Sequence, residues 1–206
     1  MVKEGYGYGL PLLLAAAGLL ALRLYLSGAV FLAVAALILN FFRDPERDVP
    51  QTPGVVVSPA DGKIVQMVNE THEGRPVRRL SIFMSPLNVH VNRAPIAGII
   101  ESVSYRKGTF SIAARDEASI QNEQNVFTLA GEQGKVIVKQ IAGAVARRIV
   151  FWKRVGDRLA RGERLGLIKF GSRVDVLFEP GIELRVKVGD RVRAGSTILG
   201  SREPNS

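Results

Sequence analysis

The sequence predicts a mainly β protein with an apolar N-terminal appendage. Two observations support this class. From about residue 55 onward, short runs alternate apolar and polar residues, and turn residues separate them at short spacing, as in sandwiches and barrels. Residues 10–42, in contrast, are almost wholly apolar. With 206 residues and 22.4 kDa, the chain suits one domain of ordinary size plus that appendage.

Composition excludes several kinds of site. The chain has no cysteine, which rules out disulfides, thiolate catalysis and cysteine-ligated metals. Its only histidines are His72 and His90, too few for a histidine-rich metal site, and no tight cluster of Asp and Glu replaces them. We therefore expect no metal. His72 lies in a polar turn sequence, and no role is predicted for it.

The charge balance favours an anionic partner. The formal net charge is +9 and the pI is near 10.2, which suits either nucleic acid or an acidic membrane surface. Aromatic residues are sparse and no recognition motif appears, so nucleic-acid binding is the weaker hypothesis. Each basic residue near an anionic bilayer contributes about 1 kcal/mol of attraction. The segment between residues 147 and 173 is especially basic and contains Arg147, Arg148, Lys153, Arg154, Arg158, Arg161, Arg164, Lys169 and Arg173.

The apolar segment is expected to associate with a membrane. It divides at Arg23–Gly28 into two arms, Leu10–Leu22 and Ala29–Leu39, each shorter than the roughly 20 residues that cross a bilayer. One continuous span would place Arg23 near the bilayer centre, at a cost of about 2.5–3.5 kcal/mol. We therefore predict a helical hairpin dipped into one leaflet, with Arg23 and Ser27 near its turn. A tilted single membrane helix is the alternative, and a cleaved signal peptide or a buried core helix fits less well.

A linker, residues 43–54, follows the apolar segment (residues 1–42) and precedes the β domain, residues 55–206. The motif Arg43-Asp-Pro-Glu-Arg47 ends the helical pattern with charge and a proline. The alternating pattern then predicts strands at 54–57, 62–68, 79–84, 98–105, 125–129 and 135–141. The stretch Ala142–Trp152 is compatible with either a short helix or a strand.

One internal repeat is visible. The sequence Val155-Gly-Asp-Arg-Leu-Ala-Arg-Gly recurs 33 residues later (188 − 155) as Val188-Gly-Asp-Arg-Val-Arg-Ala-Gly. Each copy predicts a Gly-Asp turn, a strand, a glycine turn and a second strand. This pattern resembles the hairpins of biotinyl/lipoyl-like domains, so we expect a pseudo-symmetric, barrel-sandwich-hybrid-like β domain.

A candidate reaction centre lies between the two copies, at Gly171-Ser172. A Gly-Ser pair in a strand-rich region is compatible with a simple bulge or turn. Two distant stretches, however, supply a carboxylate, Asp61, and an imidazole, His90. A serine hydroxyl, a histidine base and an orienting aspartate are the parts of an activated nucleophile.

Such a serine can react with the peptide bond before it. Attack on the preceding carbonyl converts the amide to an ester, and a preceding glycine leaves the approach open. β-Elimination then breaks the chain and leaves dehydroalanine, which hydrolyses to a pyruvoyl group. The pyruvoyl ketone forms a Schiff base with an amine and withdraws electrons from an adjacent carbanion, which suits decarboxylation of an amino acid.

Six motifs together resemble the short form of the phosphatidylserine decarboxylase family. The resemblance runs from about Phe42 to about Gly200, and the apolar N-terminus matches the family's membrane segment. The motifs are Phe42-Arg-Asp-Pro-Glu-Arg47, Ser58-Pro-Ala-Asp-Gly-Lys-Ile64, Met84-Ser-Pro-Leu-Asn-Val-His-Val-Asn-Arg93, Gly108-Thr-Phe110, Asn122-Glu-Gln-Asn125 and Phe170-Gly-Ser-Arg-Val-Asp175.

The resemblance implies a self-cleaving proenzyme with a covalent pyruvoyl cofactor formed from Ser172. The cut would lie between Gly171 and Ser172, giving a β chain, residues 1–171, and an α chain, residues 172–206, that stay associated. The expected reaction is decarboxylation of phosphatidylserine, or of an ether lipid bearing phosphoserine, to the ethanolamine lipid. Membership implies a cell-membrane protein acting at the cytoplasmic face, and by analogy a possible homodimer.

The resemblance also assigns roles to residues. Asp61 matches the aspartate of the self-cleavage triad. Longer members carry a His-x-x-His pair where this chain has His90 and Arg93, so either His90 serves both self-cleavage and decarboxylation or Arg93 takes part of the role. Asn122 and Asn125 are possible polar contacts to the substrate, as is Arg93.

Two other classes of function remain open from the residues alone. A non-enzymatic biotinyl/lipoyl-like membrane adaptor would explain the repeat, but no lysine lies at a hairpin tip in a modification motif. A serine hydrolase could use Asp61, His90 and Ser172, although the Gly-x-Ser-x-Gly elbow is missing.

Overall fold

The computed structural model comprises two compact units. It describes residues 1–108, 122–143, 148–169 and 172–202. One unit covers Met1–Glu46 and the other covers Arg47–Ser206.

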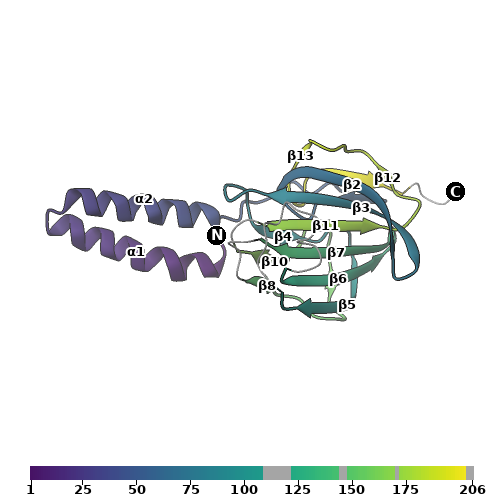
Figure 1. Cartoon of the computed structure of the whole chain (residues 1–206), viewed down its shortest axis with the longest axis horizontal. Coiled ribbons are helices and arrows are strands. Elements are labelled where there is room, and N and C mark those ends of the chain that lie inside the picture. Colours follow the sequence, from purple (N-terminus) through teal and green to yellow (C-terminus); the bar gives the residue numbers. More distant parts are fainter. Residues whose placement is uncertain (109–121, 144–147, 170–171, 203–206) are drawn as a thin grey trace. The chain divides into compact units, whose positions relative to one another are not determined.

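The first unit is a helical hairpin. Helix α1 covers Lys3–Ala21 and helix α2 covers Tyr25–Phe41, and the two run side by side (Figure 1). The chain reverses within three residues, where Arg23 has a φ of 61°. The predicted hairpin is therefore confirmed, and the alternative of one continuous helix is wrong, because the α-helical backbone is interrupted between Ala21 and Tyr25. Within the described part of the chain, neither helix combines the length and hydropathy required to cross a bilayer.

Small residues form the contact between the two helices. Gly9 and Gly28 leave room for the side chains of Leu39 and Leu20, which a Cβ at either position would approach within 2.4–2.6 Å. Ala16 and Ala35 are also buried. The large apolar side chains lie on the outside instead, among them Leu10, Leu14, Leu26, Val30 and Leu37.

The second unit consists of strands, which confirms the mainly β class. The six predicted runs all form strands, most of them longer than predicted, and the undecided stretch contains β8. The strands are β1 (Val55–Val57), β2 (Gly62–His72), β3 (Arg75–Met84), β4 (Val91–Arg93), β5 (Gly98–Arg106), β6 (Gln124–Gly131), β7 (Gly134–Ala142), β8 (Ile149–Phe151), β9 (Arg158–Leu159), β10 (Arg164–Ile168), β11 (Ser172–Phe178), β12 (Glu183–Leu184), β13 (Arg191–Val192) and β14 (Ile198–Ser201).

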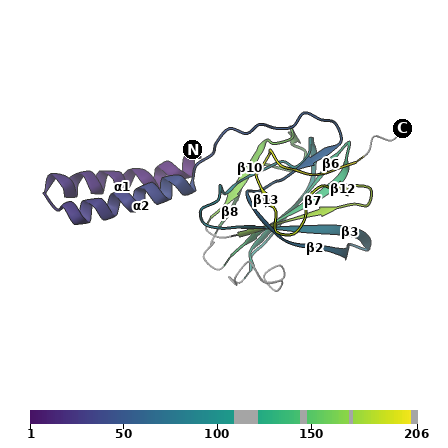
Figure 2. The same ribbon diagram turned by 90° about the horizontal axis from the view of Figure 1, so that it is seen from above.

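Three sheets make up this unit. The largest has the order β13-β2-β3-β11-β7-β6-β5-β9 and curls into a half-barrel, and the two smaller sheets are β1-β14-β12 and β4-β10-β8. Figure 2 shows β8 and β10 beside one another, away from β2 and β3. One hydrophobic core joins the sheets and includes Ile82, Phe127, Val138, Leu165 and Val176. Strand β11 is central, with β3 on one side and β7 on the other.

The sequence repeat is a structural repeat. In the first copy, β9 pairs with Gly98 at the start of β5. In the second copy, β13 pairs with Gly62 at the start of β2. The turns agree as well, because Gly156 and Gly189 have φ values of 91° and 100°. The copies therefore occupy the two edges of the large sheet.

The partners of the two copies are also equivalent. The segment Ser58–Ile64 and the segment Ala94–Ile100 make the same backbone hydrogen bonds to their respective copies. The amide of Ile64 donates to Asp190, and the amide of Ile100 donates to Asp157. The segments are also joined reciprocally, since the amide of Arg93 donates to Pro59 while that of Val57 donates to Pro95. The second unit is thus built around a pseudo-twofold relation.

Candidate active site

Ser172 lies in the interior of the large sheet. It is the first residue of β11, where it pairs with Met84 of β3 and Ala142 of β7, and it has no exposed surface. Its hydroxyl donates to the Met84 sulfur at 3.3 Å. Its predicted partner, Gly171, lies outside the described residues. The candidate nucleophile is therefore shielded from water, with a weak acceptor as its hydrogen-bond partner.

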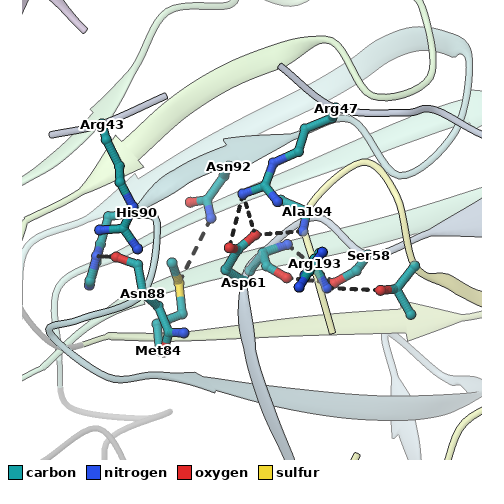
Figure 3. A network of polar contacts seen from close by, with 12 residues as sticks. Arg43, Arg47, Ser58, Asp61, Met84, Asn88, His90, Asn92, Arg193 and Ala194 are labelled. Atoms are coloured by element: carbon teal, nitrogen blue, oxygen red, sulfur yellow. Dashed lines mark hydrogen bonds and ion pairs between the residues drawn. The ribbon is translucent and has the colours of Figure 1, made fainter. Parts of the chain in front are cut away.

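His90 is held by the turn that precedes β4. Its Nδ1 atom is 2.9 Å from the backbone carbonyl of Asn88 (Figure 3). Because a carbonyl only accepts, Nδ1 must carry the proton, which leaves the lone pair of the neutral ring on the buried Nε2. The side chain of Asn88 stabilises this turn by accepting bonds from the amide and hydroxyl of Ser85, at 2.8 and 2.9 Å. The ring is thus fixed in the tautomer that makes Nε2 a base.

Asp61 is bound by an arginine and a backbone amide. Its carboxylate accepts from Arg47 at 2.9 and 3.0 Å and from the amide of Ala194 at 2.7 Å (Figure 3). The pair is largely buried, with side-chain exposures of 9% for Arg47 and 12% for Asp61. The carboxylate that was predicted to orient His90 is therefore engaged with Arg47, whereas a backbone carbonyl contacts Nδ1. The triad role of Asp61 stays a prediction.

Backbone bonds bring the predicted segments together. The amide of Arg93, in the strand that follows His90, donates to the carbonyl of Pro59, two residues before Asp61, at 2.9 Å. The side chain of Asn92 reaches the same carbonyl at 3.4 Å and the Met84 sulfur at 3.9 Å. Met84 is the partner of Ser172 as well. The stretches that carry Asp61, His90 and Ser172 thus meet at one end of the core.

The structure adds residues that the sequence analysis missed. Gln140 donates to Asn92 at 2.8 Å and accepts from Asn125 at 2.8 Å, and all three side chains are buried. Gln140 occupies an inward position of β7 in the alternating series Val136, Val138, Gln140. A polar residue at an otherwise apolar inward position was the available signal. For Arg47, the available signal was its place in one of the six motifs.

The three predicted substrate contacts, Asn122, Arg93 and Asn125, each bind a different partner. Asn122 donates to the carbonyl of Ala142, directly beside Ser172, at 2.6 Å. Arg93 is buried and donates to the carbonyl of Gly162 at 3.1 Å, which ties β4 to the first repeat copy. Asn125 faces Gln140 across two paired strands. These contacts fix the surroundings of Ser172, and whether any of the three touches substrate stays a prediction.

The other face of β11 carries a buried ion pair. Arg173 contacts the carboxylate of Asp175 at 2.9 and 3.0 Å, and each side chain is 1% exposed. Arg79 lies 3.8 Å from the same carboxylate. Burial lowers the pKa of the nearby Lys139 ammonium, while the negative charges of Glu70 and Asp175 act in the opposite direction. Strand β11 is consequently enclosed on both faces.

No candidate metal centre accompanies this arrangement in the part of the chain that is described, where no three His, Asp or Glu side chains are grouped to hold an ion. The predicted reactive groups remain the Ser172 hydroxyl, the His90 imidazole and the Asp61 carboxylate.

Comparison with known proteins identifies relatives over most of the chain. The family model described as phosphatidylserine decarboxylase matches residues 34–200. A phosphatidylserine decarboxylase proenzyme from Solibacter usitatus (strain Ellin6076) is 52% identical over 206 residues, which cover 98% of this chain and 97% of that protein. Proenzymes of the same name from Salinibacter ruber (strain DSM 13855 / M31) and Geotalea uraniireducens (strain Rf4) are 49% and 45% identical, over 80% and 84% of this chain and 75% and 82% of their own lengths. The chain belongs to the phosphatidylserine decarboxylase family.

Proposed function

We propose that this protein decarboxylates phosphatidylserine to phosphatidylethanolamine, using a pyruvoyl group made from its own Ser172. Family membership supports the reaction. The observation that carries the residue assignment is the position of Ser172, whose hydroxyl is buried at the start of a central strand, at the end of the core where the Asp61 and His90 segments meet.

Maturation begins with the Ser172 hydroxyl. The oxygen attacks the carbonyl carbon of Gly171, an O–C bond forms, and the C–N bond to Ser172 breaks, which gives an ester. Loss of the Cα proton and of the ester oxygen from Cβ then releases the Gly171 carboxylate and leaves dehydroalanine. Water hydrolyses this to the pyruvoyl group and ammonia.

His90 acts as the base in this scheme. Because Nδ1 is committed to the carbonyl of Asn88, the proton of Ser172 goes to Nε2. Burial keeps bulk water away from both groups, which strengthens their electrostatic interaction. Asp61 contributes negative charge at the same end of the core and, through the amide of Ala194, anchors the second repeat copy of the α chain to the β chain.

The two chains stay together after the cut because β11 is a central strand. Seven residues of β11 pair with β3, and the same seven pair with β7. Strands β3 and β7 both belong to the β chain. Both faces of β11 are buried along its length. Strands β13 and β14 add pairs with β2 and β1. The new N-terminus at residue 172 is consequently held inside the sheet.

The surroundings of Ser172 fit a small covalent ketone. The side chain already occupies a dry space, bordered by the Met84 thioether and by the polar end of the core. When formed, the pyruvoyl group would bind the substrate amine covalently and accept the electrons released with carbon dioxide. We assign the proton that replaces carbon dioxide on the substrate to His90, whose segment meets that of Ser172 at this end of the core.

The helical hairpin is proposed to enter the lipid of the cell membrane from the cytoplasmic face. In a water-soluble hairpin, large apolar side chains face the helix contact and polar ones face outward. Here the fully buried residues of the contact are glycine and alanine, and leucines such as Leu14 and Leu26 are exposed. Small residues at the contact and an apolar exterior are typical of helices packed in lipid. The basic segment that contains Lys153, Arg154 and Arg158 would add attraction to anionic headgroups.

Replacement of the nucleophile tests the mechanism. Ser172→Ala should remain a single uncut chain and release no carbon dioxide from phosphatidylserine vesicles, because no hydroxyl can form the ester. Ser81→Ala, which alters a buried serine of the neighbouring β3, should be cut and active. A Ser172→Ala protein that decarboxylates phosphatidylserine would exclude the mechanism.

Charge on the hairpin exterior tests the membrane proposal. Leu14→Asp and Leu26→Asp place carboxylates at side chains that are 65% and 83% exposed, and each should reduce co-sedimentation of the full chain with anionic vesicles. Val188→Asp, at an exposed position outside both the hairpin and the basic segment, is the matched control and should bind as wild type does. Equal binding of all three variants would count against lipid insertion of the hairpin.

A further inference from the structure

The inward side chains of the large sheet change character at the end where Ser172 lies. Along β6, β7 and β11 the inward positions are apolar in the middle of the sheet, for example Phe127, Val138 and Val176. At the Ser172 end they become polar. Asn125, Gln140 and Ser172, together with Asn92 of β4, are all at most 2% exposed. Burying this many polar groups is costly unless each is hydrogen-bonded.

Three carboxamides among them form a directed chain, which we call the amide relay: Asn125, Gln140 and Asn92. Nδ2 of Asn125 donates to Oε1 of Gln140, and Nε2 of Gln140 donates to Oδ1 of Asn92, each at 2.8 Å. Nδ2 of Asn92 then faces two atoms that only accept, the Pro59 carbonyl oxygen at 3.4 Å and the Met84 sulfur at 3.9 Å. The carbonyl therefore sets the direction of all three amides.

The relay ends on the atom that Ser172 also contacts. The Ser172 hydroxyl donates to the Met84 sulfur at 3.3 Å. A thioether is a weak acceptor, so it holds both donors without competing strongly with a reaction partner. The relay thus fixes Asn92, Met84 and the Pro59 carbonyl of the Asp61 loop around one hydroxyl.

We propose that the amide relay is a positioning device for Ser172, and that the direction of its hydrogen bonds, and not only its presence, sets the rate of self-cleavage. This inference rests on the proposed function. Asn92 and Met84 position the hydroxyl, and Gln140 of β7 and Asn125 of β6 position Asn92.

Reversing one amide should reverse its neighbours. A carboxylate at position 140 cannot donate to Oδ1 of Asn92, so Asn92 must rotate its amide to present Nδ2 to the carboxylate. The Asn92 oxygen then faces the Pro59 carbonyl oxygen and the Met84 sulfur. The two oxygens repel each other, and the sulfur loses its hydrogen-bond donor. A protonated glutamic acid can still donate, so low pH should restore the original direction.

The test is a time course of self-cleavage of the full chain, made by cell-free translation with phosphatidylserine vesicles and followed on gels at several pH values. Gln140→Glu should be cut about tenfold more slowly than wild type at mildly alkaline pH, since small misplacements cost this much or more. The deficit should shrink as the pH falls. His90, Glu123 and the Asp61–Arg47 pair lie at this end in both proteins, so the ratio of variant to wild-type rates isolates position 140.

Asn125→Asp provides a second variant, further from Ser172. The carboxylate should accept a hydrogen bond from Nε2 of Gln140, so the Gln140 amide must rotate. Its Oε1 atom then faces Asn92, whose amide must rotate in turn, and self-cleavage should again be slower. If Asn125 served only as a substrate contact, this variant would be cut at the wild-type rate and would show only a raised KM for phosphatidylserine.

The control is Gln66→Glu, the same amide-to-acid change in β2, where the side chain accepts a bond from Arg79 outside the relay. It should be cut at the wild-type rate. Gln140→Glu and Asn125→Asp proteins that unfold cooperatively like wild type yet are cut at wild-type rates at every pH would overturn the relay alone. Failure of wild type to be cut at Ser172 would instead overturn the proposed function.

Discussion

The two pseudo-equivalent halves of the β unit share a backbone arrangement and differ in their side chains. In one half, the segment Ser58–Ile64 joins the repeat copy that starts at Val188. In the other half, the segment Ala94–Ile100 joins the copy that starts at Val155. The amide of Gly195 donates to Ser58, and the amide of Gly162 donates to Ala94, both at 2.8 Å. The same turn is therefore made twice.

One difference lies at Asp61, whose equivalent in the other half is Ala97. Both residues precede a glycine that starts a long strand, Gly62 of β2 and Gly98 of β5. Asp61 is buried against Arg47 and the amide of Ala194, whereas Ala97 is exposed. Since the second half closes the turn with an alanine, the turn does not require a carboxylate. A role of Asp61 in the reaction centre is therefore the prediction to test.

The largest effect is expected when Asp61 is removed together with its partner Arg47. In the double variant Arg47→Met/Asp61→Ala, both members of the buried pair are removed, because loss of Asp61 alone would leave an uncompensated buried charge. We expect a folded protein whose self-cleavage is slowed by about 10²–10⁴, the usual contribution of a residue assisting proton transfer. Time courses on gels and thermal unfolding are the measurements.

The reciprocal change in the other half is the control. Ala97→Asp places a carboxylate at the equivalent, exposed position and should leave self-cleavage unchanged. If the double variant is cut as fast as wild type, Asp61 serves only the fold.

An intermediate effect is expected at the two equivalent glycines. A Cβ at Gly62 would lie 2.2 Å from the carbonyl oxygen of Phe83, and one at Gly98 would lie 2.2 Å from that of Ala130. Gly62→Ala and Gly98→Ala should each lower the free energy of unfolding by about 1–3 kcal/mol, measured by denaturant titration in a Ser172→Ala background that keeps the chain whole.

Self-cleavage should separate these two glycine variants. With Ser172 present, Gly62→Ala should slow the cut more than Gly98→Ala, because it moves the loop that carries Asp61. Equal rates in two equally stable variants would argue that the halves do not differ in function.

The smallest effect is expected at the far end of β5. The Tyr105 hydroxyl donates to Glu123 at 2.7 Å, and this bond raises the pKa of Tyr105. Because the pKa of Tyr105 is raised in the folded state, its hydroxyl stabilises the fold fully below the ordinary tyrosine pKa. This stabilisation is lost as the pH rises through the raised value. In a spectrophotometric titration, one of the four tyrosines should titrate last and be missing in Tyr105→Phe. A Tyr105→Phe curve that loses an earlier-titrating group instead would contradict the assignment.

Much of the fold could be predicted from the sequence because its signals are local. Alternation predicted the strands 62–68 and 135–141, and repeated Gly-Asp turns predicted two equivalent hairpins. The interruption at Arg23 predicted the helical reversal. The extension of the repeat to Ser58–Ile64 and Ala94–Ile100 was not predicted, since those segments share backbone hydrogen bonds more than residues.

The candidate site was predicted only in part. Ser172, His90 and Asp61 belong to motifs, and the structure brings their segments together. The Arg47–Asp61 pair joins residues 14 positions apart across a linker, and Gln140 meets Asn92 over 48 positions, so no local pattern reveals either contact. The carbonyl of Asn88 as the partner of His90 is likewise a backbone feature, which composition and spacing do not record.

If Ser172 becomes the first residue of a separate chain, an intact mass spectrum of the purified protein will show it. We expect two chains, residues 1–171 and residues 172–206, and the shorter one has 35 residues (206 − 171). The shorter chain should be lighter by one ammonia than a peptide that starts with serine. A single chain of 22.4 kDa in a preparation that decarboxylates phosphatidylserine would exclude a pyruvoyl group made from Ser172.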